Sequence, residues 1–154
     1  MMTSQALNIS ITIPCASEFV GVVRLALSGV AARMNFSLDD IEDIKVAISE
    51  ACTNAVQHAY GSNADPYSQS IQVDVLAYAD RLEVLVKDKG KGFDSAFLGT
   101  EEQISQSEEN LGLGLGLTFV KSLMDDVELT TSETGTILRM VKKTPSPFEL
   151  VGSA

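Results

Sequence analysis

The chain has 154 residues, of which 45% are hydrophobic and 21% are charged, and this composition predicts one globular domain with its own core. The formal net charge of -10 argues against direct binding to nucleic acid, because a phosphate backbone would be repelled. Two distant cysteines and one histidine argue against a disulfide framework and a zinc site, and the lack of a signal peptide or a membrane-spanning apolar stretch predicts a cytoplasmic protein.

The first third of the chain predicts one strand and two helices. Apolar and polar residues alternate from Leu7 to Ile13, which is the period of a half-buried strand. From Ala16 to about Met34 the apolar spacing becomes helical, and a second helix is predicted to run from an N-cap at Ser37 to about Ala59. The predicted buried stripe of the first helix is Phe19, Val22, Val23, Ala26 and Val30. That of the second helix is Ile41, Ile44, Ile48, Ala51 and Ala55.

The rest of the chain predicts four strands and a third helix. The predicted strands cover residues 71–78, 82–87, 127–131 and 136–142, with turns at Ala79-Asp80 and Gly135. Residues 95–111 show no period and predict a mobile segment, after which "GLGLG" leads into a short helix that ends near Asp125. The order β-α-α-β-β-α-β-β predicts an α+β fold class, a mostly antiparallel mixed sheet with helices on one face.

Three polar residues form one row on the second predicted helix. Glu50, Asn54 and His58 are spaced i, i+4 and i+8, so they share one face. A solvated polar face explains such a row in a generic helix, but asparagine is a poor helix former and the adjacent faces here are apolar. A carboxylate one turn from an amide is also suited to a hydrated divalent ion such as Mg²⁺, which leaves the carboxylate to orient or deprotonate a nucleophile.

The segment "DKGKGFD", residues 88–94, follows the third predicted strand. Asp and Gly are common turn residues, so an ordinary turn is one interpretation. The other is a backbone that approaches a planar ligand, with Asp88 accepting a hydrogen bond from an exocyclic amine. Gly90 and Gly92 would then remove side chains that block the approach.

The segment "GLGLG", residues 112–116, stands directly before the third predicted helix. Backbone amides at a helix N-terminus can bind an anion, although the glycines are equally compatible with close helix packing. The segment matches neither the "GxxxxGK[ST]" phosphate loop nor the "GxGxxG" dinucleotide motif. By itself it is therefore a weak signal.

In this order, "EACTNAVQHAY", "DKGKGF" and "GLGLG" resemble the N, G1 and G2 boxes of the GHKL ATPases, which have the Bergerat fold. Within that group the chain resembles the anti-sigma-factor serine kinases of the RsbW and SpoIIAB type, and RsbW more closely. The resemblance covers nearly all of residues 7–142, including "FVGVVRLALSGVAARM" and "KSLMDDVEL". It implies a two-layer α/β sandwich with one kinase domain at 1–143, a lid at about 94–113 and a flexible tail at 144–154.

The resemblance also implies a role for each motif residue. Glu50 is implied to be the catalytic base, and Asn54 the ligand of Mg²⁺. Asp88 is implied to read the adenine of ATP or ADP. The remaining implied nucleotide contacts are Gly90, Gly92, Gly112, Gly114, Gly116 and Thr136. For His58 the preferred interpretation is a structural histidine at the helix end, and for Cys52 a small core residue.

The function implied by the resemblance is a partner switch. Such a protein sequesters an alternative sigma factor as an anti-sigma factor, and as a serine/threonine protein kinase it phosphorylates a serine of a STAS-domain antagonist with ATP. A homodimer is implied, with Arg24 of the first helix contacting the sigma factor, although a solvated helix charge is the alternative for Arg24.

One feature departs from the family. Family lids often carry a basic residue, whereas this chain has no Lys or Arg between Asp94 and Val120, which leaves Lys89 and Lys91 as the nearest candidates for charge compensation. Two alternatives therefore stay open: a nucleotide-binding anti-sigma module with little kinase activity, and the ATPase domain of a histidine kinase.

Overall fold

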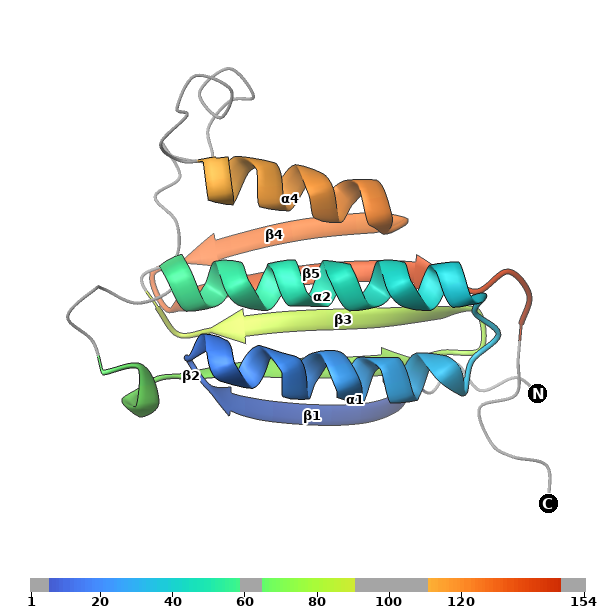
Figure 1. Ribbon diagram of the computed structural model, residues 1–154, viewed down its shortest axis with the longest axis horizontal. Helices are drawn as coiled ribbons and strands as arrows, with labels where there is room; N and C mark the ends of the chain where they lie inside the picture. Colours follow the sequence, from blue (N-terminus) through green and yellow to red (C-terminus); the bar gives the residue numbers. More distant parts are fainter. Residues whose placement is uncertain (1–5, 59–64, 91–110, 148–154) are drawn as a thin grey trace.

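The computed structural model describes residues 6–58, 65–90 and 111–147. Within these ranges, five strands form one sheet and three helices lie on one of its faces (Figure 1). The strands are β1 (Leu7–Pro14), β2 (Ser70–Ala77), β3 (Arg81–Asp88), β4 (Asp126–Ser132) and β5 (Gly135–Lys143). The helices are α1 (Val20–Ala32), α2 (Leu38–His58) and α4 (Leu111–Leu123), with short 3-10 turns η1 (Ser17–Phe19) and η2 (Pro66–Ser68).

The predicted fold class is confirmed. The sheet has the order β1-β2-β3-β5-β4, and the helices cover only one of its faces. Each of the four pairs of neighbouring strands is antiparallel, so among the described strands the sheet is not mixed. The tight β4–β5 turn pairs one edge of β5 with β4. The other edge of β5 pairs with β3, so β5 lies between these two strands.

The core lies between the sheet and the helices. Alternate residues of β2 and β3 face it, and α2 presents to it the apolar stripe that its sequence period predicts. The fully buried side chains include Ile44, Ile48, Cys52, Ile71, Val73, Leu82 and Val84. Each such side chain contributes about 1.5–3 kcal/mol relative to exposure, so the position of α2 on the sheet is strongly determined.

Two predictions of burial are wrong. On α1 the side chain of Val22 is 52% exposed, because the buried face of this helix is formed by Val20, Val23, Leu27 and Ala31. A residue adjacent to Val23 is turned about 100° away from that face. On β1 only Ile13 is fully buried, while Leu7 and Ile9 are exposed, because β1 is an edge strand with β2 as its only neighbour in the described sheet.

The elements that carry the predicted motifs meet at one end of the sheet. There α2 and β3 end, and α4 and β5 begin (Figure 1). Segments far apart in the sequence are therefore adjacent in space, which is the condition for a common site.

At the opposite end, Lys142 connects β5 to two helices. Its side chain is only 12% exposed, and its Nζ donates a hydrogen bond to the carbonyl of Leu123 at 2.7 Å. The same ammonium lies 3.6 Å from Asp43 and 3.8 Å from Asp40 on α2. A cation at the C-terminal carbonyls of α4 also opposes the negative end of the helix dipole.

We expect Lys142→Met to lower the free energy of unfolding by about 1–3 kcal/mol, because it leaves a carbonyl without its donor and two carboxylates without their cation. Lys143→Met is the matched control, since Lys143 is the exposed next residue on the same strand, and it should change stability by less than about 0.5 kcal/mol. Chemical denaturation measures both. Equal stability of the two variants would contradict the tethering role of Lys142.

Candidate functional site

Helix α2 places Glu50 and Asn54 on one face, one turn apart, and both side chains are half-buried. The helix begins as predicted, because the Oγ of Ser37 accepts a hydrogen bond from the backbone N–H of Asp40 at 3.1 Å. His58 is the last residue of α2, and its side chain lies outside the described part of the structure. Two of the three residues of the predicted polar row are thus positioned on a rigid, buried helix.

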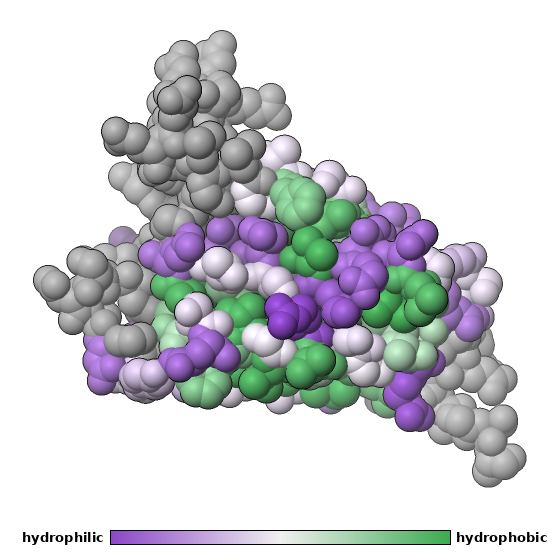
Figure 2. All heavy atoms as spheres, viewed as in Figure 1, coloured by the Kyte–Doolittle hydropathy of each residue, from purple (hydrophilic) through white to green (hydrophobic). Residues whose placement is uncertain are grey.

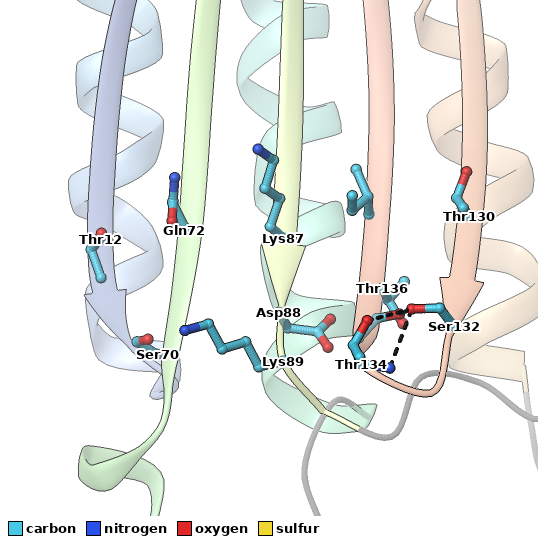
Figure 3. Close-up of a pocket in the computed structure, with 12 residues that line it drawn as sticks. Thr12, Ser70, Gln72, Lys87, Asp88, Lys89, Thr130, Ser132, Thr134 and Thr136 are labelled. Atoms are coloured by element: carbon cyan, nitrogen blue, oxygen red, sulfur yellow. Dashed lines mark hydrogen bonds between the residues drawn. The ribbon is translucent and has the colours of Figure 1, made fainter.

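Asp88 and Thr136 form the second part of the site. They are direct partners across the antiparallel pair β3 and β5, and the carboxylate of Asp88 points toward Thr136 (Figure 3). The carboxylate Oδ1 accepts a hydrogen bond from the N–H of Gly90 at 2.9 Å. Burial raises the pKa of Asp88, while hydrogen bonds from the backbone of Gly90 and Thr136 act in the opposite direction.

The Thr136 hydroxyl has no partner of its own. Thr136 is buried, with 4% of its surface exposed, and its Oγ1 makes no hydrogen bond. An unsatisfied buried polar group costs about 1–3 kcal/mol, so a ligand that supplies the missing partner is favoured. A planar base with an amine for Asp88 and a ring nitrogen or bridging water for Thr136 fits this pair of groups, and adenine has that chemistry.

Gly135 is a site residue that the sequence reveals only as a turn. Its φ is +146°, and a Cβ built on it would lie 2.0 Å from the backbone oxygen of Asp88. The β4–β5 turn therefore packs directly against the strand end that carries the carboxylate. The glycine immediately before Thr136 was the available sequence signal, but the contact depends on how β3 and β5 pair.

The predicted glycines on α4 are part of the helix instead of a loop before it. α4 starts at Leu111, so Gly112 and Gly114 belong to its first turn, and Gly116 is its sixth residue. Gly116 faces Asn54, since a Cβ on it would lie 2.8 Å from the Asn54 Nδ2. Gly92 lies outside the described residues, as does most of the predicted lid.

Cys15 connects the two parts of the site. Its Sγ lies 3.9 Å from the carbonyl oxygens of Ala55 and Val56 on α2. Burial raises the pKa of the Cys15 thiol, and the negative charge of Asp88 raises it further. The thiol thus lies against the C-terminal part of the helix that carries Asn54.

A hollow of about 430 Å³ lies at the same end of the sheet, on the face that the helices leave open (Figure 3). Asp88 and Thr136 contribute to its wall together with Lys87, Lys89 and several hydroxyl side chains, but Glu50, Asn54 and Gly116 do not. We place the functional site on the helix side, where those three residues lie and toward which Asp88 is oriented by its alternation with the buried residue Val86. Lys89 extends over the open face, away from α2.

The described residues offer few protein ligands for a metal ion. Among the described residues, no group of three or more His, Cys, Asp or Glu side chains could hold a metal ion. A Mg²⁺ ion would therefore need Asn54, water and oxygens of the ligand, which is a usual coordination for Mg²⁺ at phosphates.

In the described ranges, no helix is long and apolar enough to cross a membrane.

Residues 13–142 match the family model of the histidine kinase-like ATPase domain. Serine-protein kinase RsbW from Halalkalibacterium halodurans is 42% identical over 92% of this chain and 86% of its own length. RsbW from Bacillus pumilus is 45% identical, over 87% of this chain and 84% of its own. The chain belongs to the RsbW serine-protein kinases of the histidine kinase-like ATPase family. The family predicted from the sequence motifs is confirmed.

Solved structures show the same fold. The RsbU and RsbW domains of a Mycobacterium tuberculosis protein give a TM-score of 0.65 at 22% identity, over 93% of this chain and 34% of that longer one. A histidine kinase domain from Erythrobacter litoralis gives 0.55 at 21% identity, over 86% of this chain and 62% of that one. The two-layer arrangement is thus common to kinases of different substrate type.

We expect Gly135→Ala to lower the free energy of unfolding by at least about 2 kcal/mol, because both the backbone angle and the contact with Asp88 exclude a side chain. Gly29→Ala is the control, since a Cβ at Gly29 on α1 meets nothing within 4 Å. That change should be neutral or stabilising by up to about 1 kcal/mol. Thermal unfolding of the two variants would contradict this account if Gly135→Ala were as stable as Gly29→Ala.

Proposed function

We propose that this protein is an anti-sigma factor and a serine/threonine protein kinase. It sequesters an alternative sigma factor, and it uses ATP with Mg²⁺ to phosphorylate a serine of a STAS-domain antagonist. The observation that carries the proposal is the buried, unpartnered Thr136 hydroxyl beside the half-buried Asp88, at the end of the sheet where α2 carries Glu50 and Asn54. Membership of the RsbW kinases supports the substrate class.

Asp88 and Thr136 bind the adenine of ATP or ADP in this proposal. The carboxylate accepts a hydrogen bond from the adenine amine, and the ligand satisfies the buried Thr136 hydroxyl. Gly90, whose N–H already holds Asp88, has no side chain to block the base. Gly92 contributes in the same way by family resemblance alone.

The phosphates lie between α2 and the start of α4 in this proposal. The first four N–H groups of a helix have no partner within it, and Gly112 and Gly114 contribute such groups in α4. Asn54 supplies an oxygen to Mg²⁺, which neutralises phosphate charge. This arrangement compensates for the lack of a basic residue between Asp94 and Val120.

Glu50 acts as the general base. It takes the proton of the substrate serine as the serine oxygen bonds to the γ-phosphorus, and the bond to the bridging oxygen breaks to release ADP. Phosphoryl transfer needs positioning and charge neutralisation more than covalent chemistry, and a half-buried carboxylate on a rigid helix provides the first. The added phosphate then weakens antagonist binding by introducing charge into the interface.

We expect Glu50→Gln to retain ATP and Mg²⁺ binding but to slow phosphate transfer by roughly 10²–10⁴-fold, the usual contribution of a positioned general base. Glu42→Gln is the control, since Glu42 is an exposed glutamate of the same helix. The measurement is single-turnover transfer to a STAS-domain antagonist at saturating ATP. A near wild-type rate for Glu50→Gln would remove Glu50 from the role of base.

The same phosphate-transfer assay distinguishes the proposed kinase from a second candidate function. The absence of Lys and Arg between Asp94 and Val120 favours a nucleotide-binding anti-sigma module with little kinase activity. In that case the unmodified protein binds ADP and the sigma factor but transfers no phosphate to any STAS partner. Detectable transfer that depends on Glu50 excludes this candidate.

Arg24 is proposed to contact the sigma factor. It is exposed on α1, directly before Leu25 in the sequence, and the same helix exposes Leu25 by 70% and Val22 by 52%. The helix face of the molecule shows hydrophobic surface along α1 with hydrophilic side chains beside it (Figure 2). Arginine next to exposed apolar side chains is typical of protein interfaces, where it is over-represented.

We expect Arg24→Glu to weaken sigma-factor binding at least about tenfold, equivalent to 1.4 kcal/mol, while ADP affinity stays unchanged. Arg33→Glu is the matched control, because Arg33 is exposed at the other end of the same helix. Titration with labelled sigma factor measures the affinity. If both variants bind the sigma factor equally well, Arg24 is an ordinary solvated charge.

A homodimer and a cytoplasmic location complete the proposal. The outer edge of β1 has no neighbour in the described sheet, and the exposed Leu7 and Ile9 lie on this strand. An edge strand with exposed apolar side chains is suited to pairing with a second chain, which supports the dimer. The location follows from the proposed partner, because sigma factors act in the cytoplasm.

A further inference from the structure

We infer that Gly116 is a positioning residue for Asn54: the backbone of α4 at this glycine is the surface against which the Asn54 amide rests. The inference deepens the proposed function, on which it rests, because it assigns to Gly116 a different task from phosphate contact. The task is to keep the amide in the orientation in which its oxygen can reach a metal ion.

The contact is defined by three distances. A Cβ on Gly116 would lie 2.8 Å from Nδ2, 3.2 Å from Oδ1 and 3.4 Å from Cγ of Asn54. All three atoms belong to the amide group, and the nitrogen and oxygen are nearer than Cγ, so the outer end of the amide meets the glycine. Gly29 on α1 is different, since nothing lies within 4 Å of a Cβ there. Among the helical glycines whose surroundings the structure describes, Gly21, Gly29 and Gly116, only Gly116 would bring a Cβ within 3.0 Å of another group.

Helix geometry argues against Gly116 as a phosphate donor. Only the first four N–H groups of a helix lack an intrahelical acceptor, and Gly116 is the sixth residue of α4. Its N–H points to the carbonyl one turn earlier, where Gly112 stands. Glycine is also a poor residue for a helix interior, and at this position the close approach of Asn54 gives a packing reason for it, which Gly29 lacks.

If a side chain were added at position 116, the Asn54 amide would be the group that moves. α4 is held by its buried residue Val120, by the buried Met124 directly after its end and by the hydrogen bond from Lys142 to Leu123. Asn54 is half-buried and changes position by rotation about its side-chain torsions. A methyl group at position 116 therefore turns the amide away from its resting orientation and leaves α4 in place.

The test is a double-mutant cycle with Gly116→Ala and Asn54→Ala, and Gly29→Ala as the matched control. Calorimetry measures ADP and ATP affinity in Mg²⁺ and in EDTA. We expect Gly116→Ala to weaken binding at least tenfold in Mg²⁺ and less than twofold in EDTA. In the Asn54→Ala background, Gly116→Ala should have no further effect on affinity, because the amide that it displaces is absent.

Thermal unfolding without nucleotide provides a second readout of the same contact. Gly116→Ala should raise the unfolding midpoint in the Asn54→Ala background, where a methyl group in the helix interior meets no amide. In the unmodified protein it should raise the midpoint less or lower it, because the amide must turn away. Gly29→Ala should leave nucleotide affinity unchanged and the midpoint equal or higher in both backgrounds.

The inference is overturned if Gly116→Ala binds Mg²⁺-nucleotide like the unmodified protein, or if it shifts the midpoint by the same amount in both backgrounds. Its failure is distinct from that of the proposed function. If the unmodified protein shows no Mg²⁺-dependent nucleotide affinity, the proposed function fails, and the unfolding cycle alone then decides whether the glycine positions the amide.

Discussion

The structure depends on the packing of α2 against the sheet. Ile44, Ile48, Ala51 and Cys52 bury one side of this helix almost completely, and the buried alanines let it lie close to the strands. Because the helix cannot rotate without exposing these residues, Glu50 and Asn54 are held in a constant direction. Side chains on a buried helix are more accurately positioned than side chains on a loop.

Two close backbone contacts complete the site around that helix. At Gly135 the β4–β5 turn lies against the backbone of Asp88, and at Gly116 the backbone of α4 lies against Asn54. Each contact is possible only because a side chain is missing. The two glycines therefore let neighbouring backbone approach Asp88 and Asn54, the residues that in our proposal bind the base and the metal ion.

The charge of the site raises a separate question, since an acidic chain must bind an acidic ligand. Lys87 is paired with Asp74 at 2.7 Å, and Lys89 extends over the open face of the sheet (Figure 3). Burial raises the pKa of Asp74, but hydrogen bonds from Gln72, Lys87 and Ser10 lower it to about 2. The positive potential at the phosphates therefore comes, in our proposal, from Mg²⁺ and from the N–H groups of α4.

Local patterns were sufficient for the order of the elements and for naming most residues of the candidate site. Periods and spacings within short segments predict the buried stripe of α2, the strands and the motif residues Glu50, Asn54 and Asp88. These patterns are local, so they can be recognised without knowing the tertiary structure. The exposure of Val22 and of Leu7 did not follow, because it depends on which face of α1 is covered and on β1 being an edge strand.

Only the tertiary structure decided how the motifs meet. The pairing of β3 with β5 brings the unsatisfied Thr136 hydroxyl to Asp88, and the approach of α4 to α2 brings Gly116 to Asn54. Neither contact has a signature in sequence spacing, because each joins segments separated by other elements. The sequence by itself determined the chemical groups of the site, and the packing of strands and helices determined their distances and their unsatisfied hydrogen bonds.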